Sequence, residues 1–473
     1  MATENTRPEL LRDLTVWHAI AIVAGTIIGS GIFRVPGVMM KDVGSAGLVY
    51  LVWIVGGLLS FAGALTYAEL GAMKPWAGGE YVYVRDAYGP LPGFLYAWTW
   101  FLIAKPGSIA TITTGIVDVL GTFHRLSFLA NSFFTWHITA TRTFEVTYGH
   151  LVAIAATLLI SGLNYVGVKK AGSFQLVFTA LKVAMIAAII FIGFTATSGG
   201  WSNFHTTFLG AKGGMAGFML ALVAALWAYD GWNDLNMVSG EIRNPERTIP
   251  IALITGVAIV AVLYMGINAA VQYVMPASAI AGSKVPASLA TQIAIGPWGA
   301  ALVSIGMALS MCVTLNGTIM SGGRIPFAVA RDGYFFKALA EVHPRFHTPS
   351  WAIVVQAIVA IVLLLIGGAF QELLNLTISA EWLFYMIAAS TIFYFRWREP
   401  NTPRPYRTWG YPVVPAVFIL VAAVLLVYTF MNNERDSTIG IAVILAGVPV
   451  YWYFAKQRKS RPGASGPEYS GPR

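Results

Sequence analysis

Twelve long apolar stretches, separated by short polar connections, dominate this sequence. A helix needs about 20 apolar residues to cross the hydrocarbon core of a bilayer, and most of the stretches reach that length. Only 11% of the 473 residues are charged, against roughly a quarter in soluble proteins, so the chain lacks the surface that a water-soluble globule needs. We therefore predict an all-α membrane protein with 12 transmembrane helices near residues 14–39, 46–72, 89–118, 148–168, 172–197, 214–239, 248–275, 296–322, 350–368, 373–396, 411–430 and 438–455.

The distribution of lysine and arginine predicts the orientation of these helices. With the N-terminus inside, 21 of the 30 basic residues fall in cytoplasmic segments and seven in outer segments, while Lys105 and Lys182 lie within helices. Because an excess of basic residues marks the cytoplasmic side, we expect both termini in the cytoplasm and the protein in the plasma (inner) membrane. The net charge of +9 follows from this topology, and we expect no nucleic-acid partner. The single cysteine, Cys312, can form neither an intramolecular disulfide nor a thiolate metal site, and no cofactor is expected.

Two short segments interrupt apolar helices that lie five helices apart. They are GTIIGSGIF at 25–33 and AYDGWN at 228–233. Paired interruptions of this kind point to a transporter site near mid-membrane, between two repeats of opposite orientation. The corresponding division of the chain is a cytoplasmic N-terminus at 1–13, a first repeat at 14–197, a second repeat at 214–396, two further helices at 411–455 and a disordered Pro-, Gly- and Ser-rich tail at 456–473.

The first interruption carries three glycines within seven residues, which lets the backbone leave helical angles and approach a ligand. The N–H groups of Ser30, Gly31 and Ile32 would then open a second half-helix, whose positive end suits a carboxylate. Glycines in a membrane helix more often serve close packing of two helices. The following Pro36 and the partner interruption favour the binding site instead.

The second interruption and the preceding Trp227 together place an acid, a glycine and two tryptophans in an apolar helix. Its first half-helix would end with free carbonyls, for example at Trp227 and Asp230, which suit an ammonium group. The two interruptions together predict a receptor for a zwitterion that needs no charged side chain. Trp227 is a natural lid over the ligand.

Buried charged residues are the other functional candidates, because they are costly at membrane depth. Asp230 either contacts a cationic substrate side chain, balances Lys182 or caps the second half-helix. Lys182 lies too deep to reach the surface easily, and it could replace a sodium ion by donating to carbonyls of the first helix and to a hydroxyl such as Ser310 or Thr314. Glu381 could carry a proton or shape the pocket, and either Glu381 or Lys105 could belong to a structural pair.

Several motifs resemble the L-type amino acid transporter family of the amino acid, polyamine and organocation superfamily. They are GTIIGSGIF, the segment FAGALTYAELGAMKPWAGGEYVYVRDAYGPLPGFLYAW at 61–98, AKPGS at 104–108, LWAYDGWNDLNMVSGEIRNPERTIP at 226–250, NGTIMSGGRIPFAVARDGYF at 316–335 and RPYR at 404–407. The resemblance implies a LeuT-type 5+5 inverted repeat with broken helices 1 and 6, and exchange of amino acids without sodium. By the same resemblance, Ser30, Gly31 and Ile32 would bind the substrate carboxylate.

The resemblance also implies roles for the remaining candidates. Carbonyls of Ile27, Trp227 and Asp230 would bind the amino group, and Lys182 matches a lysine that occupies the place of a sodium site. The full set of expected substrate-binding residues is Ile27, Ser30, Gly31, Ile32, Trp227, Ala228 and Asp230, and the expected coupling or gating residues are Lys182, Trp227 and Glu381.

Three departures from the family pattern affect these expectations. Animal members bond to a single-span glycoprotein through a cysteine between helices three and four, but residues 119–147 contain none, so we expect no disulfide-linked heavy chain and a bacterial member. Glu381 replaces a small apolar residue of many animal relatives. Val271 stands where those relatives carry a tyrosine linked to the lysine network.

We therefore expect a sodium-independent L-amino acid exchanger for neutral substrates, with cationic ones left open because Asp230 resembles the acid of members that accept both. A proton-coupled symporter is the alternative. A polyamine carrier would need acids in place of the GSGIF backbone, and no HExxH or GxSxG motif indicates an enzyme. A receptor or channel stays formally open.

Overall fold

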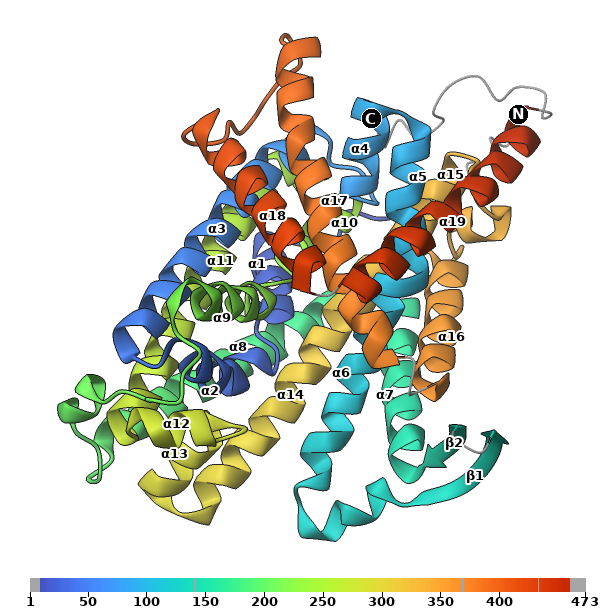
Figure 1. Ribbon diagram of the computed structural model, residues 1–473. Helices are drawn as coiled ribbons and strands as arrows, with labels where there is room; N and C mark the ends of the chain where they lie inside the picture. Colours follow the sequence, from blue (N-terminus) through green and yellow to red (C-terminus); the bar gives the residue numbers. More distant parts are fainter. Residues whose placement is uncertain (1–8, 140–141, 367–369, 433, 460–473) are drawn as a thin grey trace.

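The computed structural model describes residues 9–139, 142–366, 370–432 and 434–459 (Figure 1). Its helices are α1 (Val16–Ile27), α2 (Gly31–Val43), α3 (Ala46–Met73), α4 (Glu80–Tyr88), α5 (Pro90–Thr99), α6 (Lys105–Gly121), α7 (Tyr148–Tyr165), α8 (Val168–Thr195), α9 (Gly214–Ala228), α10 (Asp234–Met237), α11 (Pro245–Val274), α12 (Ala277–Gly282), α13 (Pro286–Ile295), α14 (Pro297–Gly322), α15 (Arg324–Arg331), α16 (Ser350–Ile366), α17 (Phe370–Arg398), α18 (Val413–Asn432) and α19 (Glu434–Lys459). Short 3-10 turns are η2 (His124–Ala130), η3 (Trp201–His205), η4 (Ser239–Glu241) and η5 (Lys337–Ala340), and η1 (Trp100–Ala104) is a π-helical turn.

The all-α prediction is wrong in one place. Strands β1 (Ser132–Thr139) and β2 (Arg142–Thr147) pair antiparallel between α6 and α7. Their alternating polar and apolar residues suit a pleated strand, where successive side chains point to opposite faces. A segment expected to be a loop is therefore a β-hairpin.

Among the described residues, eight helical segments are long and apolar enough to cross a membrane, and α1 with α2 forms a ninth bent by 40°. Three predicted spans remain. Those at 214–239 and 350–368 coincide with the shorter apolar helices α9 and α16, and the one at 373–396 coincides with α17. The protein is thus a helical, multi-span membrane protein, and the twelve-span count stays a prediction. Residues 1–8 and 460–473, most of both predicted terminal segments, lie outside the described residues, while α19 extends to Lys459 and shortens the predicted tail.

The third predicted helix is locally distorted in the structure. It divides into α5, η1 and α6, with Pro106 in the first turn of α6. Proline lacks an N–H donor and crowds the preceding turn, which favours a change in hydrogen-bond pattern there. Lys105 directly follows the distortion as the first residue of α6, and its side chain is buried.

Buried ion pairs fix the connections at one end of the bundle. The guanidinium of Arg324 donates to both oxygens of Glu241, at 2.7 and 3.0 Å, and both side chains are fully buried. Arg396 binds Glu69 in the same two-pronged way, at 2.9 and 2.7 Å. Bidentate pairs of this kind impose a defined geometry as well as charge balance.

The first and last described parts of the chain lie on the same side of the bundle. The carbonyl of Glu9 hydrogen-bonds the ring of His347, and Arg458 donates to the hydroxyl of Tyr334. Both partners belong to the connection between α15 and α16. An even number of crossings is required for this arrangement, and the assignment of this side to the cytoplasm stays a prediction.

Candidate functional site

The first interruption separates α1 from α2 at residues 28–30. Ile28 leaves the helical conformation with a ψ of 89°, so the last carbonyls of α1 lose their intrahelical partners. The α2 half begins at Gly31, and its first N–H groups point toward the gap. The break therefore exposes a carbonyl end and an N–H end within a few residues of each other.

The second interruption separates α9 from α10, and it faces the first. Gly231 has a φ of +102°, a conformation that favours glycine, and an added Cβ there would lie 2.9 Å from the side chain of Thr26. A Cβ on Gly31 would in turn lie 3.2 Å from the Cβ of Ala228 and 3.5 Å from the ring of Trp227. The two breaks are thus packed against each other through residues with little or no side chain.

A cavity of about 410 Å³ lies where the two breaks meet. Seven predicted site residues line it: Ile27, Ser30, Gly31, Trp227, Ala228, Asp230 and Glu381. Ile32 and Lys182 do not line the cavity, and both side chains are fully buried. Trp227 is 45% exposed, as a ring at the cavity edge would be. The volume suits a ligand of amino-acid size.

Lys182 of α8 fills the space behind the first break. Its Nζ donates to the carbonyls of Gly25 and Ile28, at 2.8 and 2.7 Å, and to the carbonyl of Ser310, at 3.2 Å. The first two contacts place the ammonium at the negative end of α1, where the helix dipole favours a cation. The lysine therefore satisfies carbonyls that the break has left without partners.

The predicted contact from Lys182 to a hydroxyl is not present. The Ser310 hydroxyl instead donates to the Ile28 carbonyl at 2.7 Å, and the Thr314 hydroxyl lies 3.3 Å from the carbonyls of both Gly25 and Ile28. A protonated amine has only donors, and hydroxyl donors compete with it for the same carbonyls. The amine and the two hydroxyls thus share a common set of acceptors.

Helix α11 contributes a tyrosine that the sequence did not reveal. The Tyr264 hydroxyl lies 3.1 Å from the Ile27 carbonyl and 2.7 Å from the Ala228 carbonyl, and so links the ends of α1 and α9. Tyr264 precedes Val271, the position where a tyrosine was expected and missing, by about two helical turns. Its position among apolar residues gave no sign of which carbonyls it would meet.

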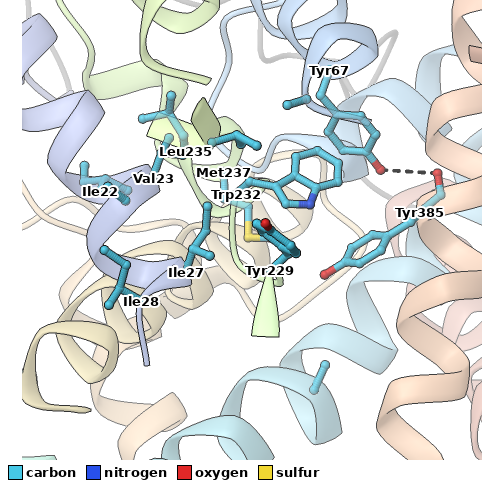
Figure 2. Close-up of a cluster of buried hydrophobic side chains, with 14 of the residues drawn as sticks. Ile22, Val23, Ile27, Ile28, Tyr67, Tyr229, Trp232, Leu235, Met237 and Tyr385 are labelled. Atoms are coloured by element: carbon cyan, nitrogen blue, oxygen red, sulfur yellow. Dashed lines mark hydrogen bonds between the residues drawn. The ribbon is translucent and has the colours of Figure 1, made fainter. Parts of the chain in front are cut away.

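Asp230 accepts a hydrogen bond from the Tyr385 hydroxyl at 2.9 Å, and the same hydroxyl lies 3.4 Å from Oδ1 of Asn233. Tyr385 belongs to α17, so this contact connects the second break to a distant helix. Figure 2 shows Trp232 between α1 and Tyr385, and its ring packs edge-on against that of Tyr67 at 4.8 Å. Asp230 therefore has a protein partner on one side and the cavity on the other.

A second acid, Asp234, neutralises the lysine of α6. Lys105 forms a salt bridge with Asp234, which also accepts a hydrogen bond from Ser321 at 3.0 Å. The sequence analysis expected that Lys105 could belong to a structural pair but did not name its partner. The structure shows that the partner is Asp234, the first residue of α10. In the described part of the chain, no three His, Cys, Asp or Glu side chains gather closely enough to hold a metal ion.

Glu80 is a further buried acid next to the second break. It begins α4, a nine-residue helix that does not span a membrane, and Asn233 donates to its Oε1 at 2.6 Å. Burial raises the pKa of Glu80 from 4.5 to about 7, although the hydrogen bond from Asn233 lowers it. The sequence motif GGEYVY contains this acid but does not indicate its burial.

Glu80 should make the stability of the protein depend on pH. Between pH 4.5 and about 7 the unfolded chain ionises this carboxyl while the folded protein keeps it protonated, so stability falls as the pH rises through that range. We expect Glu80→Gln to abolish this contribution. The melting temperature of the variant minus that of the unmodified protein should therefore increase from pH 4.5 to about 7 and stay constant above pH 7. The exposed Glu341→Gln is the control. Parallel melting profiles for Glu80→Gln and the unmodified protein would contradict the assignment.

Known proteins similar to this chain cover almost its whole length. The sequence pattern of the amino acid permease family matches residues 14–454. The b(0,+)-type amino acid transporter 1 of Mus musculus is 31% identical over 471 residues, 98% of this chain and 93% of that transporter. The serine/threonine exchanger SteT of Bacillus subtilis is 32% identical over 457 residues, 95% and 98% of the two chains. The cystine/glutamate transporter of Homo sapiens is 31% identical over 447 residues, 94% and 86%.

Proposed function

The chain belongs to the amino acid permease family, and from this premise we propose that it exchanges L-amino acids across its membrane without sodium, by alternating access. Its family and its relatives are transporters, and the chain is likewise an amino acid transporter and not an enzyme. The observation that carries the proposal is the pair of helix breaks that face each other across a 410 Å³ cavity. Broken helices at such a site are how many transporters bind substrate in the membrane.

The polarity of the two breaks fits the two ends of an amino acid. The N–H groups at Ser30, Gly31 and Ile32 begin α2 and favour a carboxylate. The carbonyls at the end of α9 favour an ammonium group. The carbonyls of Ile27 and Ala228 already bond Tyr264, but a carbonyl oxygen has two lone pairs and can accept a second donor.

Independence from sodium is supported by the contacts of Lys182. Its ammonium bonds carbonyls of Gly25, Ile28 and Ser310, and carbonyl oxygens are also the ligands that a sodium ion would need. A cation held by the protein at this place stabilises the broken end of α1. Binding of substrate then requires no accompanying metal ion.

Neutral and cationic amino acids are the proposed substrates. The relatives are named for b(0,+)-type transport, serine/threonine exchange and cystine/glutamate transport, so close relatives differ in the side chains they accept. In this chain the cavity wall carries Asp230 and Glu381 beside the second break, and both would favour a basic side chain. Thr111 and Ile112 of α6 also line the cavity and would contact neutral side chains.

The domain arrangement is part of the same proposal. Repeats over 14–197 and 214–396 would carry one broken helix each, so that a bundle containing both breaks rocks against the remaining helices. Residues 411–455 would lie outside the repeats, and both termini would face the cytoplasm from an inner membrane. The protein would work without a disulfide-linked heavy chain, because residues 119–147 contain no cysteine.

Proton-coupled symport is the second candidate, favoured by the acids Asp230 and Glu381 on the cavity wall. Proteoliposomes distinguish the two mechanisms. We expect labelled amino acid to enter vesicles preloaded with unlabelled amino acid much faster than empty ones, at both pH 5.5 and pH 7.5. Uptake into empty vesicles that collapses when the proton gradient is removed would favour the symporter and contradict exchange.

Replacement of Lys182 should stop transport. We expect Lys182→Ala to lower the exchange rate by roughly tenfold or more, since charged hydrogen bonds contribute about 1.5–3 kcal/mol each. The matched control is Lys170→Ala, an exposed lysine of the same helix. Gel filtration and melting temperature check that the variant is folded, and undiminished exchange by a folded Lys182→Ala protein would refute the role.

Replacement of Asp230 tests the substrate class. We expect Asp230→Asn to lower recognition of arginine and lysine by roughly tenfold and to leave alanine transport nearly unchanged, because only the basic side chains need the carboxylate. Asp118→Asn, another acid on the cavity wall, is the control. An equal loss for alanine would show that Asp230 maintains the backbone geometry of the break instead.

A further inference from the structure

The β-hairpin between α6 and α7 has two chemically different faces. In the antiparallel register, Phe134 pairs with Val146 and Trp136 pairs with Phe144, whereas Thr135 pairs with Glu145. Directly paired residues lie on the same face, and successive residues lie on opposite faces. One face is therefore entirely apolar and mostly aromatic, and the other carries the polar Thr135 and Glu145.

The apolar face is not covered by the protein. Trp136 is 61% exposed and Phe134 is 49% exposed. Phe134 also packs edge-on against Phe144, with 6.3 Å between the ring centroids. Figure 1 shows the hairpin projecting sideways from the helices beyond α7. An isolated two-stranded hairpin is marginally stable in water, so an exposed aromatic face of this kind needs a cover.

The exposed surface of α7 adjoins the hairpin at the start of β1. Tyr148 is the first residue of α7. The centroid of its ring lies 5.3 Å from that of Phe133 and 6.0 Å from that of Phe128. Farther along the same helix, Leu151 and Leu159 are 48% and 73% exposed, as expected of side chains that meet lipid. The hairpin thus begins at the edge of a lipid-facing surface.

We propose that the paired strands β1 and β2 form an amphipathic unit that lies at the headgroup level of the bilayer, with Phe134, Trp136, Phe144 and Val146 turned into the lipid. Tryptophan and other aromatic residues are enriched at this level because their rings tolerate its mixed polarity. The hairpin cannot sit deeper, since the outer edge of each strand has backbone groups that hydrocarbon cannot satisfy. Thr135 and Glu145 then face water, and the hairpin anchors the ends of α6 and α7 at the membrane surface, which amino acid transport itself does not require.

Spin labels at alternate residues of the hairpin test this arrangement in liposomes. In a full-length Cys312→Ala background, single cysteines replace Trp136 or Phe144 on the apolar face, and Thr135 or Glu145 on the polar face as matched controls. Collisions with oxygen report lipid, and collisions with a water-soluble nickel chelate report water. We expect the ratio of oxygen to nickel accessibility to be severalfold higher at 136 and 144 than at 135 and 145.

Two results would overturn the proposal. Equal nickel accessibility at all four sites would place the hairpin in water, and labels at 136 and 144 that are immobile and shielded from both reagents would indicate a second copy or another protein. Because Trp136→Cys could itself unfold the hairpin, a second measurement keeps the apolar face native. Labels at 135 and 145 should then relax strongly beside lipids that carry a gadolinium chelate on the headgroup, and the absence of that effect would also contradict the proposal.

Discussion

A helix that is interrupted inside a bilayer leaves backbone N–H and C=O groups that lipid cannot satisfy. In this protein the carbonyls at the end of α1 receive hydrogen bonds from Lys182, Ser310 and Tyr264, which come from three different helices. The position of each of those helices is therefore tied to the break. The same requirement leaves the N–H end of α2 directed at the cavity, where a ligand can meet it. In the proposed exchanger, binding and packing would thus depend on the same backbone groups.

Charged residues outside the cavity maintain the geometry of the connections. The Arg324–Glu241 and Arg396–Glu69 pairs join segments that are far apart in the sequence. Removing one partner of the fully buried Arg324–Glu241 pair leaves an uncompensated buried charge, which costs about 3–5 kcal/mol. Several motifs that indicated the family therefore have a structural explanation, because Glu69, Glu241 and Arg324 all lie within them. Motif membership alone does not place a residue in the site.

Both breaks could be predicted from the sequence because the first has three glycines within seven residues and the second has a charged residue, Asp230, which is rare inside an apolar helix. Their partners could not be predicted. A buried polar side chain needs a hydrogen-bond partner, but the sequence does not say which one, so Tyr264 and the pairing of Lys105 with Asp234 appeared only in the structure. The hairpin was missed for a different reason. Polar and apolar residues alternate in both strands, but residues 140–141 in the sequence lack the Asn-Gly or Asp-Gly signal of a tight turn.

The hydrogen bonds of Tyr264 constrain how the cavity can open. One hydroxyl has a single proton and contacts the carbonyls of both Ile27 and Ala228, so the ends of α1 and α9 are linked at one atom. If the two ends move as a unit, this link is preserved and the other contacts of α1 must change, including those of Lys182 on α8. If they separate, one carbonyl loses its donor, and a substrate ammonium is the group that can replace it. In the proposed alternating-access mechanism, occupancy of the cavity and the distance between the two broken helices would therefore be coupled through a shared set of carbonyl acceptors.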